Sequence, residues 1–481
     1  MNESIDLAPG LTISRVLTGL WQIADVERVD GPVDLDTASE ELHRYVEAGL
    51  NTFDMADHYG SAEEIAGRHE ERWPGRGVFM TKWVPEPGSM TAADVRAAVD
   101  LARSRMKRER IDLLQFHAWS YSDPAWMDCV FWLDELRQEG LIGHLGLTNT
   151  DTAHLAMLLD SGVPIVSNQV CYSLLDQRAA TDMAALCARH DVKMLAFGTV
   201  AGGFLTERWV GVEEPLIDDL PTWSLMKYKR FIDVTGGWGP FQELLNRVQS
   251  VARRLDVSMA NIACRYILDS PGVAGVIVGA RLGRSEHVED TLAMADVRLD
   301  DAARAEIAEG LAGMSPVPGD CGDEYRKPPF LTAAGDLSDH FEEFPAPYPT
   351  RRGGDGRTQA LSGTVWEDLA GFSRAVRKGD RILVSGTTAT HGDRLIGGDH
   401  AGSQAHFCID KLEGAIRSLG GRLEDVVRTR IYINDPDDWE SVSRAHGARF
   451  GDIQPANTLV HAGLIGEGYR VEMEAEAIVE D

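Results

Sequence analysis

The chain has 481 residues, more than a single hydrophobic core usually organises, so two domains are expected. Hydrophobic residues make up 43% and charged residues 26%, which is typical of a globular protein and excludes a disordered or fibrous one. The net charge of −29 argues against nucleic acid or an anionic membrane surface as a partner.

Targeting and redox signals are weak throughout the chain. No run of 18 apolar residues occurs, and the opening "MNESIDLAPG" is neither basic nor apolar, so neither a membrane span nor a secretion signal is expected. The six cysteines show no C-x-x-C spacing and are expected to be reduced, packed thiols. The sequence therefore predicts a cytoplasmic protein without a disulfide framework or a metal site.

The first 310 residues alternate short apolar runs with amphipathic stretches, such as "MTAADVRAAVDLARSRMKR", whose apolar residues recur at three- and four-residue steps. Eight strand–helix units at this spacing predict a parallel (β/α)8 TIM barrel, with a doubly wound α/β sheet as the alternative. The apolar runs begin at residues 15, 51, 78, 111, 142, 164, 192 and 275.

The connection 198–240 is much longer than a structural loop needs and is rich in aromatic residues. A long aromatic loop at a barrel rim usually covers a substrate. Alternatively, the loop folds its aromatic side chains onto the side of the barrel. The residues concerned are Trp209, Trp223, Tyr228, Phe231 and Trp238.

The pattern changes after residue 314. Residues 315–346 are rich in proline, glycine and acidic residues and are interpreted as a linker. Residues 347–481 contain strand-like runs near 381, 426, 457 and 470 with helical stretches at 401–419 and 436–450, which predicts a compact α+β domain. The domains are thus predicted at 1–314 and 347–481.

Polar residues end several of the predicted barrel strands. Asp54 ends "NTFD", Lys82 ends "VFMTK" and His117 ends "IDLLQFH", while Tyr59 follows the second strand. In a barrel these strand ends converge on one rim, and a buried Asp and Lys must pair. An ammonium near Tyr59 favours the phenolate, and His117 could polarise a substrate carbonyl. The group is therefore predicted to donate a proton to an oxygen that gains negative charge.

Residues 5–312 resemble the aldo-keto reductases through "FDMADHYG", "MTKW", "LLQFH", "GLTN", "SNQ" and "GAR", in this order. The resemblance implies that Tyr59 is the general acid, that Lys82 and Asp54 tune it, and that His117 orients the carbonyl. It also implies a nicotinamide cofactor bound in extended form across the rim, and no G-x-G-x-x-G follows a predicted strand.

The resemblance also suggests how this cofactor is held, and the basic positions favour NADPH over NADH. Thr148, Asn149 and Gln169 match positions at the nicotinamide carboxamide, and Phe197 matches a ring that stacks on the nicotinamide. Thr291 stands where asparagine is usual near the adenine. The remaining candidates for cofactor binding lie in "IVGARLGRSEHVEDT": Gly279, Arg281, Arg284 and Asp290.

Five tryptophans are candidates for the substrate pocket. Trp21, Trp83 and Trp119 each follow a predicted strand end, and Trp223 and Trp238 lie in the long connection. If they line the pocket, the substrate is flat or apolar, whereas the alternative for each is ordinary packing.

Residues 347–481 resemble the Rid (YjgF-like) family, trimeric α+β proteins of the chorismate mutase-like fold that hydrolyse imines and enamines. The resemblance rests on "GFSRAVRKGDRILVSGTTA", "VVRTRIYIND" and "QPANTLVHAGL". It places the cleft at Tyr348, Ser385, Asn457 and Glu472. Active members carry arginine where Asn457 stands, so an altered ligand or a trimerising scaffold is favoured, and a homotrimer is expected.

The sequence therefore predicts an NADPH-dependent reductase of a small-molecule aldehyde or ketone, fused to a Rid-like module. Three alternatives remain open: a bifunctional imine hydrolase and reductase, direct reduction of a C=N bond, and a non-catalytic redox sensor that binds nicotinamide.

Overall fold

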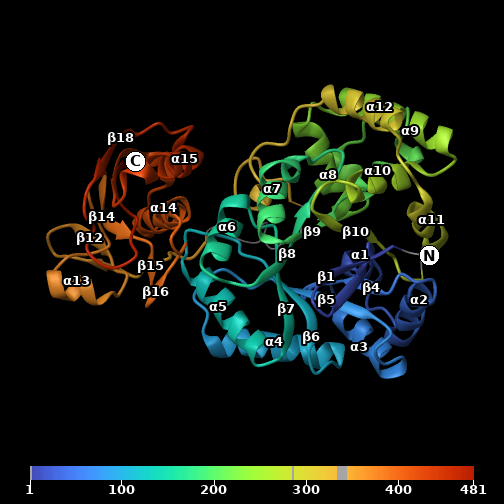
Figure 1. The fold of residues 1–481 in the computed structure, drawn as a ribbon, viewed down its shortest axis with the longest axis horizontal. Coiled ribbons are helices and arrows are strands. Elements are labelled where there is room, and N and C mark those ends of the chain that lie inside the picture. Colours follow the sequence, from blue (N-terminus) through green and yellow to red (C-terminus); the bar gives the residue numbers. More distant parts are fainter. Residues whose placement is uncertain (1–2, 284–286, 333–343, 481) are drawn as a thin grey trace.

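The computed structural model describes residues 3–283, 287–332 and 344–480, and it consists of two domains that lie side by side (Figure 1). The first is a closed barrel of eight parallel strands, in which each strand pairs with its neighbours in chain order and β10 closes against β3. The barrel strands are β3 (Val16–Gly19), β4 (Thr52–Asp54), β5 (Val78–Trp83), β6 (Ile111–Phe116), β7 (Ile142–Thr148), β8 (Ile165–Cys171), β9 (Lys193–Phe197) and β10 (Val273–Gly279).

Helices surround the barrel, and α2 shows how such a helix packs against it. In α2, Ala38, Leu42, Tyr45 and Val46 are buried at three- and four-residue steps, and Asp34 caps the helix by accepting from the Thr37 amide. The outer helices are α1 (Trp21–Asp30), α2 (Leu35–Glu47), α3 (Ala62–Arg72), α4 (Ala92–Met106), α5 (Ala125–Gln138), α6 (Thr152–Asp160), α7 (Asp182–His190), α8 (Trp223–Val234), α9 (Trp238–Leu255), α10 (Met259–Leu268), α11 (Val288–Ala293) and α12 (Asp301–Ala312).

The two ends of the barrel are closed differently. A hairpin of β1 (Ser4–Ala8) and β2 (Leu11–Ser14) packs Leu7, Leu11 and Ile13 onto apolar residues of the barrel interior. This plug leaves the other end, where the strands finish, for a site.

The segment expected to be a linker is, in its first half, part of the barrel domain. Cys321, Tyr325 and Leu331 are buried, and the short helix η6 (Asp323–Tyr325) rests on the rim at which the strands end. Arg326 fixes this segment by donating to the carbonyl oxygens of Ala118 and Asn149. The barrel domain therefore extends to about residue 332.

The second domain is a seven-stranded sheet in the order β11-β12-β13-β14-β19-β17-β18, in which the β17–β18 pair is parallel and the other pairs are antiparallel. Along β19, Val471, Met473, Ala475 and Ala477 are buried and the alternate residues are not, so one face is covered. The strands are β11 (Thr350–Arg352), β12 (Arg357–Ala360), β13 (Ala375–Lys378), β14 (Arg381–Thr388), β17 (Val426–Ile433), β18 (Ala456–His461) and β19 (Val471–Ile478).

The helix α14 (Ala401–Ser418) is the part of the second domain that packs against the barrel. It packs against β14 and β19 of its own sheet and against α6 of the barrel, and α6 and α14 are neighbours in Figure 1. Ser403 Oγ donates to Asp160 at 2.6 Å, and the Gly397 amide donates to Ser161 Oγ at 2.8 Å. The other helices of this domain are α13 (Val365–Ala370) and α15 (Trp439–Phe450), and a small hairpin joins β15 (Thr390–His391) to β16 (Arg394–Leu395).

Candidate active site

A buried ion pair lies at the open end of the barrel, where β4 and β5 finish side by side. Lys82 Nζ donates to Asp54 Oδ2 at 2.7 Å and to the Met55 carbonyl oxygen at 2.9 Å. Both side chains are about 95% buried. Burial lowers the pKa of Lys82, and the attraction of Asp54 opposes that shift. The carboxylate thus helps to keep a charged ammonium in the rim.

The second oxygen of Asp54 is held by two amides from the interior of the barrel. Oδ1 accepts from Gln169 Nε2 at 2.7 Å and from Gln115 Nε2 at 3.3 Å. Gln169 had been expected to meet the nicotinamide carboxamide, whereas here its amide nitrogen is engaged by Asp54. Gln115 was missed, although it lies two residues before His117 on the same side of the strand, where a polar residue interrupts an apolar run.

Tyr59 lies beside this ammonium. It follows β4 in a turn closed by a hydrogen bond from its own amide to the Ala56 carbonyl oxygen. The centroid of its ring is 4.8 Å from Lys82 Nζ and 5.0 Å from the Trp21 ring. A positive charge at this distance stabilises negative charge on the phenol oxygen.

His117 is buried at the end of β6 and faces the same cavity. Burial above all, together with the charge of Arg326, holds its pKa well below the usual value, so the imidazole is neutral. Its Nδ1 lies 3.3 Å from the Thr148 carbonyl oxygen, and its Nε2 has no hydrogen-bond partner among the described residues. The structure therefore leaves one ring nitrogen for a ligand.

These four residues line one cavity of about 900 Å³. It continues from His117 past Phe197 to Gly279, Arg281 and Asp290 on the far side of the rim. Such a volume is large enough for an extended dinucleotide together with a small substrate.

The end of this cavity near β7 offers acceptors to a ligand. Asn149 is buried with a φ of 54°, and its Oδ1 has no partner among the described residues. A carboxamide N–H would satisfy this orphaned oxygen. The Thr148 hydroxyl donates a hydrogen bond to the Gln169 carbonyl oxygen at 3.2 Å, which orients this stretch of backbone.

The opposite end of the cavity carries the expected guanidinium. Arg281 Nε donates to Gln22 Oε1 at 3.2 Å, and the group remains partly exposed. Asp290 accepts from Ser258 Oγ at 3.0 Å and from Asn261 Nδ2 at 3.1 Å, so in this structure it organises its neighbours. Arg284 lies outside the described residues. A nicotinamide dinucleotide thus fits the residues at both ends of the cavity.

The five tryptophans have different surroundings, and the structure places only Trp21 and Trp119 in the wall of the cavity. Trp83 follows Lys82 in the same strand, and because alternate residues face opposite sides, its ring packs on Phe116 instead. Trp223 lies at the rim, 6.1 Å from the Trp21 ring but outside the lining. The expectation of a five-tryptophan pocket is therefore corrected.

Some side chains of the connection 198–240 line the cavity, and others pack into a hydrophobic cluster. Trp238 donates to the Val212 carbonyl oxygen and packs with Trp209 and Phe204, so it belongs to a hydrophobic cluster beside the barrel. Trp209, Leu225 and Tyr228 from the same connection do line the cavity. Both interpretations of the connection apply, to different side chains.

Two lining residues were missed from the sequence. Lys227 projects from α8, and Tyr325 comes from η6; their side chains meet in a hydrogen bond of 2.5 Å. The Tyr325 ring also lies edge-on to His117 at 5.5 Å. Their local sequence does not predict that they line the cavity, because the contact joins two segments far apart in the chain.

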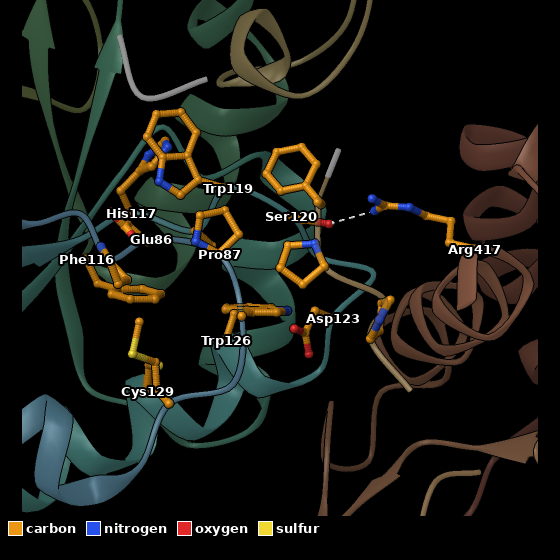
Figure 2. A pocket seen from close by; sticks show the side chains of 17 residues that line it. Glu86, Pro87, Phe116, His117, Trp119, Ser120, Asp123, Trp126, Cys129 and Arg417 are labelled. Carbon is orange, nitrogen blue, oxygen red and sulfur yellow. Dashed lines mark hydrogen bonds between the residues drawn. The ribbon is translucent and has the colours of Figure 1, made fainter. Parts of the chain in front are cut away.

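A second, small cavity of about 40 Å³ lies on the other side of His117 and Trp119, where the two domains meet. Figure 2 shows Trp119 and Trp126 on the barrel side and Arg417 from α14 reaching toward Ser120. Arg417 Nη1 donates to Ser120 Oγ at 3.1 Å and to Ser122 Oγ at 2.5 Å. The second domain thus contacts the loop that carries Trp119.

The expected cleft of the second domain is only partly assembled within one chain. Glu472 on β19 is half-buried, and burial raises its pKa. Asn457 lies on β18, beyond β17, and donates to Thr429 Oγ1 at 2.9 Å. Ser385 Oγ donates to the Ser373 carbonyl oxygen, and Tyr348 is buried. A single chain therefore does not bring Asn457 and Glu472 together.

Sequence reasoning also missed Arg374, which is 6% exposed. Burial raises the pKa of Tyr348 and of Glu472, and the positive charge of Arg374 opposes both shifts. Arg374 donates to the Gly386 carbonyl oxygen at 2.5 Å, and its Nε has no hydrogen-bond partner among the described residues. Burial, as the largest influence, lowers its pKa. The local cluster is therefore Arg374, Tyr348 and Glu472.

The cysteines, the potential metal ligands and the helices can be described for residues 3–283, 287–332 and 344–480. There, all six cysteines are free and buried, and no group of His, Cys, Asp and Glu residues is arranged to hold a metal ion. Over the same residues, no helix combines the length and apolarity that a membrane crossing requires.

The eight-stranded barrel with Tyr59, Lys82, Asp54 and His117 at its open end defines a barrel oxidoreductase site. Residues 15–311 match the aldo/keto reductase family, and the chain belongs to that family. Residues 365–479 match the family described as Endoribonuclease L-PSP, which includes the Rid/YjgF proteins. The chain thus joins an aldo-keto reductase barrel to a Rid-like domain.

Individual relatives resemble parts of the chain. The protein SCO2049 of Streptomyces coelicolor is 39% identical over 117 residues, which are 24% of this chain and 87% of that protein. The oxidoreductase YqkF of Bacillus subtilis is 29% identical over 274 residues, covering 53% and 81% of the two chains. The NADH-specific methylglyoxal reductase of Escherichia coli is 23% identical over 332 residues, covering 63% and 96%.

Proposed function

We propose that the barrel reduces the carbonyl group of a small aldehyde or ketone to an alcohol, with NADPH as the hydride donor. The observation that carries the proposal is the convergence of Tyr59, Lys82, Asp54 and His117 at one end of a cavity of about 900 Å³. Because a carbonyl oxygen gains negative charge during reduction, a proton donor and a fixed positive charge are needed at that point.

The chain's own residues divide this work. Asp54 holds Lys82 through a 2.7 Å hydrogen bond, so the ammonium stays close to the Tyr59 ring. Tyr59 gives its phenolic proton to the substrate oxygen, and the ammonium stabilises the phenolate that results. The bound nicotinamide supplies the hydride.

His117 orients the substrate through Nε2. To donate to a carbonyl oxygen, the neutral ring must carry its proton on Nε2, which gives up the contact of Nδ1 with the Thr148 carbonyl oxygen. That contact is long, at 3.3 Å, so it favours the form protonated on Nδ1 only weakly.

NADPH is preferred over NADH in this proposal because Arg281 stands at the end of the cavity away from the catalytic group. A guanidinium suits the oxygens of a 2′-phosphate. Since the methylglyoxal reductase of Escherichia coli named above is NADH-specific, family membership does not decide the cofactor, and both dinucleotides must be compared directly.

The test is NADPH oxidation followed at 340 nm with a panel of aldehydes, ketones and cyclic imines, using the wild type and Tyr59→Phe. Turnover of carbonyl substrates that Tyr59→Phe loses supports the proposal. Turnover of cyclic imines alone would favour direct C=N reduction. Tight NADPH binding without any turnover would favour a redox sensor.

For the second domain we propose a trimerising scaffold that holds three copies of the chain. The outer face of its sheet, opposite α14 and α15, carries Leu383, Val427 and Ile478, each at least 41% exposed in the single chain. Apolar side chains on a broad sheet face suit association with further copies. Light scattering after size exclusion tests the proposal, and a monomeric mass would contradict it.

Hydrolysis of imines by the second domain is the alternative. It needs a positive charge to bind the substrate carboxylate, and Asn457 supplies none. Arg374 is the nearby positive charge that acts on Glu472. Ammonia released from an imino acid by Tyr59→Phe protein would support this activity, and release no faster than in buffer would exclude it. We place the protein in the cytoplasm, where thiols such as its six free cysteines stay reduced.

A further inference from the structure

Lys227 is a buried cation in the active-site cavity. It is 7% exposed, and its Nζ donates to Tyr325 Oη at 2.5 Å. Among the described residues, no carboxylate lies within 4.0 Å of this nitrogen. Its other close neighbours are ring faces: Nζ lies 4.6 Å from the Tyr325 centroid and 5.0 Å from the Phe197 centroid. Aromatic faces attract a cation but do not neutralise it.

Other buried cations nearby each have a carboxylate partner. Lys82 is paired with Asp54, and Arg178 is paired with both Asp176 and Glu324. Lys229, two residues further along α8, is paired with Asp233 and Glu214. Because an ammonium out of water is costly without a counter-charge, an unpaired one facing a cavity points to a charge that arrives from outside.

The position of Lys227 says which part of a ligand would meet it. Tyr325 lies close to both His117 and Lys227, since its ring centroid is 5.5 Å from the imidazole and 4.6 Å from Nζ. Arg281 lies elsewhere in the lining, with its Nε bound to Gln22. The ammonium is thus close to the reacting end of the cavity, where a substrate extends away from its carbonyl group.

We propose that Lys227 binds an anionic group of the substrate, a carboxylate or a phosphate, carried a few bonds from the carbonyl that is reduced. The inference rests on the proposed reductase function and specifies its substrate class. Tyr325 positions the ammonium through its hydroxyl oxygen, and Phe197 and Tyr325 shield the ion pair from water. An ion pair in such a water-poor site contributes much more to affinity than one on a surface.

The decisive measurement is the ratio of kcat/KM for an anionic probe to that for a neutral probe with the same skeleton. The carboxylate pair is 4-carboxybenzaldehyde and its methyl ester, and the phosphate pair is glyceraldehyde 3-phosphate and glyceraldehyde. Wild-type enzyme should prefer the anionic member of at least one pair, and that pair identifies the anion. Lys227→Met should lower the ratio about 30-fold, as expected for losing one partner of a buried charge pair.

Two variants control the experiment. Lys227→Arg keeps the charge and should retain most of the preference, and Lys229→Met, on the same helix but paired with acids, should leave the ratio unchanged. A ratio that is the same in wild type and Lys227→Met overturns the proposal. A rise in the NADPH dissociation constant of Lys227→Met without a change in the ratio also overturns it, because the ammonium then serves the cofactor.

Failure of the reductase function would look different. If wild-type protein oxidises NADPH with none of the probes, the proposed function fails, and probe binding still decides the role of Lys227. Quenching of tryptophan fluorescence in the NADP⁺ complex should then show tighter binding of the anionic probes, lost in Lys227→Met and kept in Lys227→Arg. Equal binding of charged and neutral probes would overturn the inference. If Lys227→Met does not fold, Lys227→Gln takes its place in both measurements.

Discussion

His154 of the barrel and Asp410 of the second domain form a buried ion pair, with Nε2 of the histidine 2.9 Å from Oδ2 of the aspartate. The other ring nitrogen, Nδ1, lies 2.7 Å from Asp151. Because carboxylates only accept hydrogen bonds, both nitrogens carry protons and the ring is a cation. The two domains are therefore joined by a charge as well as by the packing of α6 on α14.

This pair predicts a pH-dependent stability. Burial alone would lower the pKa of His154, but the attraction of Asp151 and Asp410 raises it to about 9, above the ordinary 6.5. The stabilisation is full below about pH 6.5 and is lost as the pH rises through 9. His154→Asn should cost about 3–5 kcal/mol at pH 6 and much less at pH 9.5. Thermal unfolding across this range measures the difference.

The two carboxylates of the same cluster contribute a stabilisation with the opposite dependence on pH. Despite burial, His154 holds the pKa of Asp151 and of Asp410 below the ordinary value of 3.8, so their contribution is present above that pH and lost as the pH falls. His190→Asn, on the exposed end of α7, is the matched control and should show no such pH dependence. A constant difference between His154→Asn and wild type from pH 6 to 9.5 would contradict this account.

Tyr59→Phe should remove the proton donor and leave the cavity in place. We expect kcat to fall roughly 10²- to 10⁴-fold, the usual contribution of a general acid, while the NADPH dissociation constant stays within about twofold. Steady-state kinetics and fluorescence titration give the two numbers. Unchanged kcat in Tyr59→Phe would remove the phenol from the mechanism.

The sequence predicted the barrel and the residues at its strand ends for a clear physical reason. Strand–helix units repeat with a recognisable period, and the ends of parallel strands must converge, so Asp54, Lys82 and His117 could be grouped without coordinates. The same logic, applied more strictly, would have excluded Trp83, because neighbours in a strand point to opposite sides and Lys82 already points inward.

The remaining features depend on contacts between distant segments. Tyr325 sits in a stretch rich in proline and glycine that has no periodicity, yet it closes the rim because Arg326 anchors that stretch to two barrel loops. Lys227 and His154 gain their surroundings from segments about 100 and 250 residues away. No local pattern encodes such pairs, since only tertiary packing brings them together.

A double substitution separates the structural role of the rim ion pair from its chemical role. Lys82→Met leaves Asp54 charged and buried, which should cost about 3–5 kcal/mol in the free energy of unfolding. Adding Asp54→Asn removes the orphaned charge and should recover most of that loss, whereas kcat should stay low in both variants. Urea unfolding together with kinetics makes the comparison. If Lys82→Met alone kept full stability, the pair would not be closely coupled in solution.

Arg281 gives the sharpest test of cofactor choice. If its guanidinium meets the 2′-phosphate, Arg281→Gln loses one charge-assisted hydrogen bond of about 1.5–3 kcal/mol, which is roughly a 10- to 100-fold loss in kcat/KM for NADPH. NADH carries no such phosphate, so its kcat/KM should change little, and the variant should lose most of its discrimination between the two dinucleotides. Equal losses with both, or a wild type that prefers NADH, would place the guanidinium away from the phosphate. Gln22→Ala tests the same contact indirectly, because Gln22 holds Arg281 Nε at 3.2 Å, and it should weaken NADPH use less than Arg281→Gln does.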